Sequence, residues 1–154
     1  SIPLITPFKF FDECKKIDEL PADSKGTTIR AGATVAKRIG LISEYRWAFT
    51  LDEVIDALLV FGPVIAGTTW YAGMANPNNG IMSITGKHMG GHAYIINGVD
   101  TDKQQFRIKN SYGKSWGKNG LGFISFKDME RLLKESGPLC IPFELKLNTT
   151  PKFY

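Results

Sequence analysis

The sequence predicts an α+β fold, with helices first and strands later. Three helix-like stretches fill residues 1–61, and most strand-like stretches follow residue 62. One further helix-like stretch lies near the C-terminal end. Regular alternation of strands and helices would instead indicate a doubly wound parallel sheet. The 154 residues fit a single domain, which we expect to comprise a mainly helical part (1–61), a β-rich part (62–135) and a C-terminal tail (136–154).

Three segments of the first part carry helix signals: residues 8–20, residues 29–39 and residues 50–61. Apolar residues recur at helical spacing in the first segment. Thr27 or Thr28 is placed to cap the second segment, and Gly40 follows its end. Thr50 and Glu53 form a capping box at the start of the third. Residues 44–49 are predicted to be extended.

The second part is rich in strand signals. Four runs of β-branched and apolar residues are bounded by turn residues: 64–70, 92–99, 105–110 and 121–125. Residues 100–103 are predicted to form the turn between the second and third runs. Ser125 and Asp128 are spaced to open a last helix through Leu133, which Gly137 and Pro138 end.

Composition and charge exclude several classes of partner. The net charge is only +4, and no run of five like charges occurs, so we expect no nucleic-acid partner. The apolar stretch 57–65 is interrupted by Gly62 and Pro63 and is too short to span a bilayer. Ser1 to Pro7 lacks the features of a signal peptide, so we expect a soluble protein and give the sequon at Asn148 no weight.

The two cysteines, Cys14 and Cys140, lie far apart in the sequence. Neither belongs to a CxxC motif, so we expect buried free thiols rather than a zinc or redox site. His88 and His92 have the i, i+4 spacing of a helical zinc site. Gly90 and Gly91 between them disfavour a helix, so we predict no metal and no cofactor.

His92 and Asn110 are the candidate catalytic residues. His92 follows two glycines at the start of a predicted strand, where a side chain can project into a cleft. Imidazole is well suited to general base catalysis near neutral pH, although a structural histidine is the alternative interpretation. Asn110, in a turn rich in glycine and aromatic residues, is placed to accept the ring N–H of the histidine and orient it. The alternative is a turn that only packs its rings.

Together, Gly90-Gly91-His92-Ala93 and the segment Lys109-Asn110-Ser111-Tyr112-Gly113-x-x-Trp116-Gly117-x-x-Gly120 resemble the C-terminal half of papain-like cysteine peptidases. Gly62-Pro63-Val64 matches a strand entry of that family. Residues 27–45, followed by Trp47-Ala48-Phe49, resemble papain-like proteins of bacteria and their phages. The likeness covers about residues 10–135.

The resemblance implies a papain-like fold with a helical N-terminal part and an antiparallel, β-barrel-like C-terminal part. It implies that His92 is the general base, that Asn110 orients it, and that Trp116 shields their hydrogen bond from water. Tyr112 stands where the family often has tryptophan, which is a mild departure because tyrosine keeps the flat ring.

The nucleophile of the family is missing from the sequence. A papain-like enzyme needs a thiolate at the N-terminus of a long central helix, with a Gln shortly before it. No such segment occurs. Cys14 follows Asp12 and Glu13, which disfavour a thiolate. Cys140 lies between prolines in an apolar tail, where no helix can begin. We therefore predict that neither cysteine is the nucleophile.

Two functional interpretations follow. In the first, the chain is a catalytically silent binding or structural module of a larger assembly. By analogy with phage proteins, this assembly could be a virion, and we then expect the chain in the virion or the cytoplasm. In the second, it is the His/Asn-bearing chain of a split or processed cysteine endopeptidase. Ser1 is a small residue of the kind that methionine removal exposes, and on this ground we expect the first. In both, loss of the central helix uncovers apolar faces of residues 8–20 and 64–70, so we expect a protein partner or a second copy to cover them.

Overall fold

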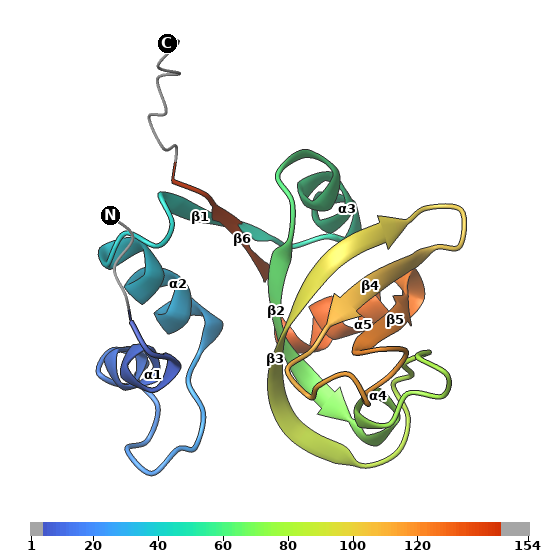
Figure 1. Cartoon of the computed structure of the whole chain (residues 1–154), viewed down its shortest axis with the longest axis horizontal. Coiled ribbons are helices and arrows are strands. Elements are labelled where there is room, and N and C mark those ends of the chain that lie inside the picture. Colours follow the sequence, from blue (N-terminus) through green and yellow to red (C-terminus); the bar gives the residue numbers. More distant parts are fainter. Residues whose placement is uncertain (1–4, 146–154) are drawn as a thin grey trace, which may run out of the picture. The chain divides into compact units, whose positions relative to one another are not determined.

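The computed structural model describes residues 5–145, which form five helices and six strands (Figure 1). Along the chain these are α1 (Pro7–Lys15), α2 (Ile29–Arg38), β1 (Glu44–Ala48), α3 (Leu51–Val60), β2 (Val64–Tyr71), α4 (Ala72–Ala75), β3 (His88–Asp100), β4 (Gln105–Lys109), β5 (Leu121–Ser125), α5 (Phe126–Ser136) and β6 (Leu139–Phe143). Helices and an antiparallel sheet are thus combined, as predicted. Ser1 and the sequon lie outside the described residues.

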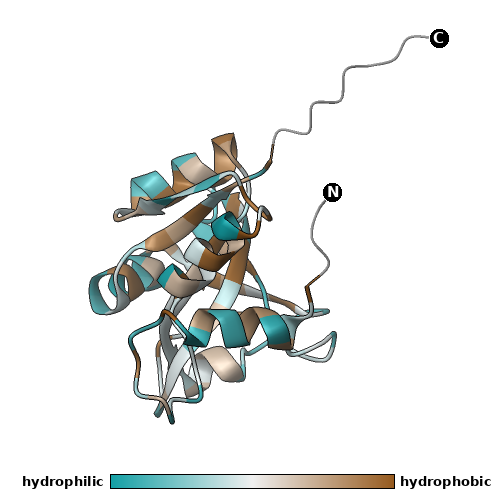
Figure 2. Ribbon diagram, turned by 90° about the vertical axis from the view of Figure 1, so that its left-hand side faces the viewer, coloured by the Kyte–Doolittle hydropathy of each residue, from teal (hydrophilic) through white to brown (hydrophobic). Residues whose placement is uncertain are grey.

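The chain divides into two compact units. The first runs to Tyr45 and resumes at Pro142, and the second is Arg46–Ile141. In the first unit, α1 and α2 pack around a small core of Cys14, Ala31 and Val35. Both helices are amphipathic, and Figure 2 shows hydrophilic and hydrophobic residues alternating along the helical ribbons. The second unit contains most of the sheet and both histidines.

Helix α1 is shorter than predicted, since it ends at Lys15 rather than near residue 20. The N–H of Ile17 bonds to the carbonyl of Cys14, and Asp18 Oδ1 accepts the N–H of Leu20. An aspartate that binds a nearby backbone N–H offers the chain an alternative to the next helical turn. Cys14 therefore lies in the last turn of α1 and not in the middle of a long helix.

The predicted helix caps are confirmed. Thr28, rather than Thr27, caps α2 by accepting the N–H of Ala31. In the capping box of α3, Thr50 Oγ1 accepts the N–H of Glu53, and the Glu53 carboxylate accepts the N–H of Thr50. The predicted Ser125 cap opens α5, which extends three residues beyond the predicted end, to Ser136.

The sheet has the strand order β1-β6-β2-β3-β4-β5, and the pairs from β2 to β5 are antiparallel. The register aligns Val64 with Ile96 and Ile96 with Ile108, so one face carries the core of the second unit. Helix α3 contacts β2, β3 and α5, and α5 contacts β2 and β5. Buried side chains from both helices and from the sheet form this core: Val54, Ala57, Val64, Ala66, Ile96, Phe106, Ile108, Ile124, Met129 and Leu132.

Three elements differ from the sequence prediction. Strand β3 begins at His88, four residues early, and the four-residue helix α4 was not predicted. Strand β6 forms where an apolar tail between prolines was expected, and it pairs with β2 through Ile65 and Cys140. Prolines at 138 and 142 gave no strand signal because proline cannot donate to a ladder. The barrel-like arrangement stays a prediction. Within residues 5–145, every helix is too short or too polar to cross a bilayer.

Candidate active site

His92 lies on β3, directly opposite Thr68 of β2. Its side chain is half-buried, at the end of the sheet face that carries the core. Gly90 before it has a φ of 102°, a backbone conformation that favours glycine. Strand β3 therefore begins before the predicted strand and includes both glycines. His92 lies in the part of β3 that pairs regularly with β2.

Asn110 directly follows β4, and the β3–β4 pairing brings it to His92. The register aligns Ile95 with Lys109, one residue before the asparagine. His92 Nε2 and Asn110 Oδ1 are 2.9 Å apart. The structure thus joins the two residues that the sequence singled out.

A second hydrogen bond fixes the orientation of this pair. The backbone N–H of Ser111 donates to the same Asn110 Oδ1 over 2.8 Å, so the amide must present its oxygen here. Because that oxygen can only accept, His92 Nε2 must carry the donated proton. In the neutral ring, Nδ1 then has a free lone pair and can take up a proton. The backbone of Ser111 therefore selects the tautomer of a histidine almost twenty residues away.

Three aromatic rings surround the imidazole of His92. The ring centroids of Trp70, Tyr112 and Tyr94 lie 4.5, 5.1 and 6.3 Å from it, respectively. Tyr94 is buried and shares a hydrogen bond of 3.0 Å with Thr68. Burial raises the pKa of the Tyr94 phenol, which therefore stays neutral. Tyr112, by contrast, is 45% exposed and forms the outer wall.

Trp116 lies behind Tyr112, which it meets edge-on at a centroid distance of 6.2 Å. The indole is buried and its N–H donates to the carbonyl of Ala75 over 3.0 Å. The two rings line a hollow together with Ala75, Asn76, Pro77, Ser115 and Gly117. The shielding of the His–Asn bond by Trp116 stays a prediction, because the ring beside His92 on this side is that of Tyr112.

Both thiols lie in apolar surroundings. Burial, together with the nearby charge of Asp18, raises the pKa of the Cys14 thiol in the first unit. Burial raises the pKa of the Cys140 thiol to about 11. Cys140 is the strand partner of Ile65, and His92 is the partner of Thr68, three residues further along β2. At a rise of about 3.3 Å per residue, these two positions are roughly 10 Å apart along the strand. A cysteine nucleophile must be a thiolate, and neither thiol is ionised at neutral pH.

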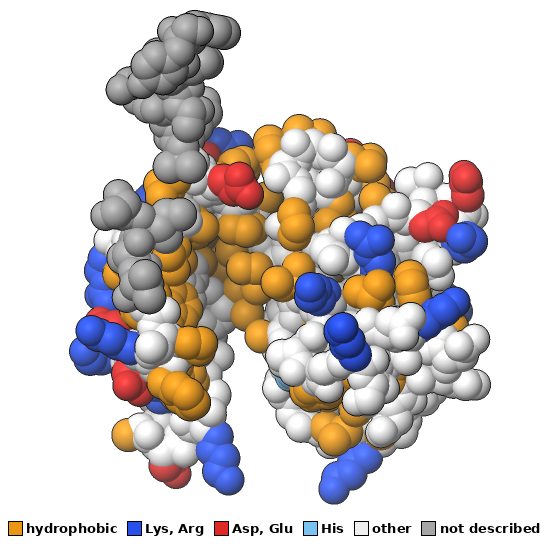
Figure 3. All heavy atoms as spheres, viewed as in Figure 1, with side chains coloured by type: hydrophobic (Ala, Val, Ile, Leu, Met, Phe, Trp, Pro, Cys, Tyr) orange, Lys and Arg blue, Asp and Glu red, His pale blue; other side chains and the backbone are white. Residues whose placement is uncertain are grey.

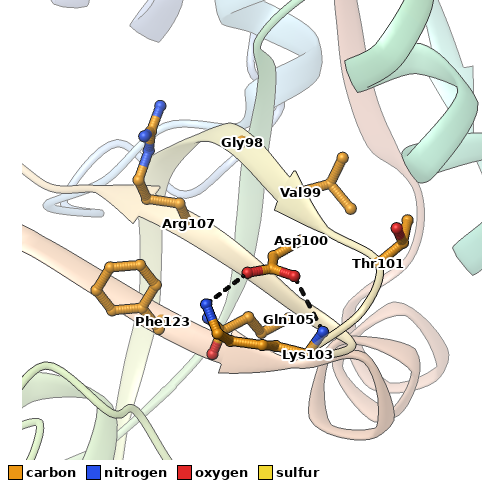
Figure 4. A pocket seen from close by; sticks show the side chains of 8 residues that line it. All are labelled: Gly98, Val99, Asp100, Thr101, Lys103, Gln105, Arg107 and Phe123. Atoms are coloured by element: carbon orange, nitrogen blue, oxygen red, sulfur yellow. Dashed lines mark hydrogen bonds and ion pairs between the residues drawn. The ribbon is translucent and has the colours of Figure 1, made fainter.

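A second hollow lies beside the β3–β4 hairpin (Figure 4). Asp100 points to Lys103, whose backbone N–H and ammonium both donate to the carboxylate. Arg107 donates to the side chain and carbonyl of Asn97. Asp100 and Lys103 are thus paired with each other, and Arg107 is bonded to the uncharged Asn97. Across residues 5–145, no group of three or more His, Cys, Asp and Glu residues is placed to hold a metal ion.

Known proteins were compared with the chain by sequence and by structure. No family model and no curated protein matches the sequence. Solved structures that share the fold include xylellain and a procathepsin B. Xylellain, a cysteine protease from Xylella fastidiosa, has a TM-score of 0.57 and 21% identity over 82% of this chain and 49% of its own. Procathepsin B S9 from Trypanosoma congolense has a TM-score of 0.53 and 14% identity over 68% and 37%.

The chain has a papain-like fold. It spans about half of the xylellain chain and less of procathepsin B. The papain-like fold was predicted chiefly from two short segments around His92 and Asn110, with support from segments upstream, and the structure places the two chief segments side by side.

The sequence did not single out two contributors to this site. One is the backbone N–H of Ser111, which no side-chain pattern reveals. The other is Trp70, which the sequence indicated only as the end of a buried strand. The available signal was its position on β2, two residues after Thr68, the partner of His92. A tryptophan at this position is a diagonal cross-strand neighbour of the histidine and is large enough to reach it.

Proposed function

We propose that the chain carries the base and the orienting residue of a cysteine-peptidase site, and that polypeptide outside these 154 residues supplies the thiol. The carrying observation is the 2.9 Å contact between His92 Nε2 and Asn110 Oδ1. With Ser111 fixing the amide, it leaves His92 Nδ1 free to accept a proton from a thiol. Xylellain, which has the same fold, is a cysteine protease.

The arrangement suits acyl transfer. A thiol beside His92 passes its proton to Nδ1, the thiolate attacks the scissile carbonyl carbon, and the imidazolium returns that proton to the leaving amine. Water then attacks the thioester carbon and loses a proton to Nδ1. The C–S bond breaks, the imidazolium returns that proton to the leaving thiolate, and the acid product departs. Throughout, the Asn110 amide oxygen accepts the hydrogen bond that the Nε2–H of His92 donates, which keeps the ring in place.

The site has features that stability alone does not explain. Asn110 Nδ2 and Trp70 Nε1, both next to His92, are buried donors without a hydrogen-bond acceptor among the described residues. Each buried unsatisfied donor costs about 1–3 kcal/mol. An arrangement that lowers stability and still orders the imidazole favours a catalytic role over a relic.

A covering polypeptide is also expected at β3. Met89 and Ile95 are 56% and 42% exposed, and alternate residues between them, Gly91 and Ala93, are exposed as well. Figure 3 shows hydrophobic side chains exposed among polar and charged ones on one side of the molecule. This exposed apolar row lies on the strand that carries His92, and an exposed apolar row suits an interface. We propose that the thiol-bearing polypeptide packs on this row.

Labelling of the native material tests the proposal. The chain is recovered from its source under non-denaturing conditions and treated with an epoxide inhibitor directed at papain-like thiolates. Intact mass spectrometry then identifies the modified polypeptide. We expect the label on a cysteine other than Cys14 and Cys140, and its loss in a His92→Ala variant. Label on Cys14, or label that survives this substitution, contradicts the proposal.

A second candidate function rests on the two buried thiols, which leave the described chain without a working nucleophile of its own. It is a catalytically silent module that binds a partner in a larger assembly, such as a virion. Recovery of a stoichiometric partner without any epoxide-reactive cysteine supports this candidate over the first.

A further inference from the structure

Trp70 makes the shortest of the ring contacts to the candidate base. Its indole centroid lies 4.5 Å from the imidazole of His92, with the planes tilted by 45°. The side chain is 2% exposed, on the core face of β2. Thr68, two residues earlier, is the direct partner of His92. Trp70 is thus a diagonal cross-strand neighbour, a separation that a large ring spans.

Trp70 also joins the other rings of the cluster. It meets Tyr94 at 5.5 Å and Tyr112 edge-on at 6.3 Å. Tyr112 is 45% exposed, whereas Trp70 is almost fully buried. The indole is therefore the fixed inner wall of the imidazole site, and Tyr112 is its outer wall. Packing in a buried cluster of this kind restricts a ring to one rotamer.

The hydrogen bond to Asn110 does not by itself fix the imidazole. It sets the position of Nε2, but the ring can still tilt about the line from Cβ to Nε2. That tilt moves Nδ1, the atom that must meet a thiol. A large, buried ring packed 4.5 Å from the imidazole restricts this tilt. Asn110 and Trp70 thus act on different degrees of freedom of the same side chain.

The choice of tryptophan carries a cost at this position. Trp70 Nε1 is buried without an acceptor among the described residues, whereas leucine would fill apolar space without an unpaired donor. We infer that Trp70 is a positioning residue that holds the plane of the His92 imidazole. Its catalytic meaning rests on the proposed function, but the contact itself is testable on this chain alone.

The test uses the chain with 15N-labelled histidine, in which only His88 and His92 give imidazole signals. Solvent exchange of the His92 Nε2 proton is measured by NMR in the native protein, in Trp70→Leu and in Trp70→Phe. Loss of an aromatic pair worth about 0.5–1.5 kcal/mol should speed exchange about two- to tenfold in Trp70→Leu. Trp70→Phe keeps a ring and should stay within about twofold of the native rate.

Two internal controls separate positioning from general destabilisation. The His88 signals, from a ring that contacts Tyr71 at 6.0 Å, should not change. Exchange of the backbone amide of Ile96, in the core of β3, should also keep its native rate. If Trp70→Leu does not fold, Trp70→Met fills the buried volume and is judged by the same criteria. Native exchange at His92 without the indole overturns the inference, as does equal acceleration at His92 and Ile96.

The outcome is separable from that of the proposed function. The exchange experiment needs no thiol, whereas epoxide labelling does. Faster exchange in Trp70→Leu supports the inference even if no partner cysteine is labelled, and then only the peptidase proposal fails. In labelled native material, Trp70→Leu should slow labelling and Trp70→Phe should restore most of the rate. Unchanged labelling in Trp70→Leu contradicts a role in catalysis.

Discussion

The thiols and the candidate base of this chain lie in opposite kinds of surroundings. Cys14 and Cys140 are fully buried, and burial raises the pKa of each thiol. His92 is half-buried, with one nitrogen bonded to Asn110 and the other available. Reactivity of a cysteine depends on exposure and on stabilisation of its thiolate, and both are lacking here. The difference teaches that the chain presents a candidate base, while its own cysteines serve the cores of the two units.

The largest expected effect is on thiol reactivity. In the folded chain, modification of Cys14 and Cys140 by iodoacetamide at neutral pH should be at least about a thousandfold slower than in urea, since it requires opening of the fold. Mass spectrometry over a time course measures both rates. A Cys14 that reacts at the unfolded rate in native buffer would break the contrast with His92.

Free energies of unfolding provide the next comparison. Cys140→Ser buries a hydroxyl in place of a thiol in an apolar site and should cost about 1–3 kcal/mol. Asn110→Ala frees the N–H groups of His92 and Ser111 toward water and removes a buried unpaired donor, so it should change stability by less than about 1 kcal/mol. Urea denaturation measures both.

Cys140→Ala is the matched control, because it deletes the sulfur without adding a polar group. A loss of stability in Asn110→Ala equal to that in Cys140→Ser would mean that the asparagine holds the fold together. The contrast between a structural thiol and a functional amide would then disappear.

Local signals explain how much of the fold was predictable. The capping box of Thr50 and Glu53 and the caps of α2 and α5 involve residues three positions apart, and all three were predicted correctly. The end of α1 was not, because the Asp18 side chain stops the helix through a turn that apolar periodicity does not report. Strand β6 depends on pairing with β2, which lies more than seventy residues earlier.

The candidate site likewise contains residues that local sequence patterns reveal and residues that only long-range contacts bring in. His92 and Asn110 stand in glycine- and aromatic-rich segments with a distinctive pattern, so the sequence singled out both as candidates, and the structure brings them together. Trp70 is part of the site only through the register of β2 against β3, a long-range property. The orphaned amide hydrogens of Asn110 are a property of three-dimensional packing and leave no trace in the sequence.

Tight packing around Trp116 gives a further test of the imidazole side. A Cβ added at Gly122 would lie 2.5 Å from the Trp116 ring and 2.6 Å from Met82 Sδ. Gly122→Ala should therefore displace the indole and cost about 1–3 kcal/mol through overpacking. Tryptophan fluorescence and urea denaturation should both change.

Gly90→Ala is a useful comparison, since a Cβ there meets no atom within 4 Å. Its cost comes from the positive φ alone. Unchanged fluorescence in Gly122→Ala would show that Trp116 is not held in place from this side. The outer wall of the imidazole site would then rest on Tyr112 alone.

The smallest expected effect concerns the turn that joins the strands leading to His92 and Asn110. The backbone N–H and then the ammonium of Lys103 bind the carboxylate and hold the pKa of Asp100 below its ordinary value. A lowered pKa in the folded state means that the charge stabilises the fold above the ordinary value of about 3.9 and that this contribution is lost as pH falls. Asp100→Asn should therefore lower the thermal midpoint slightly at pH 7, and the difference should shrink below pH 4.

Asp102→Asn removes the same charge from the neighbouring turn position and serves as the control. Equal losses in the two variants at pH 7 would assign the effect to net charge instead of to the Lys103 bonds. Because the hairpin carries the candidate dyad but not the thiols, Asp100→Asn should also speed exchange of the His92 Nε2 proton more than it speeds modification of Cys14. That difference follows because Cys14 lies in the first compact unit and the β3–β4 hairpin in the second, so loosening of the turn acts on β3 and β4 before it acts on α1.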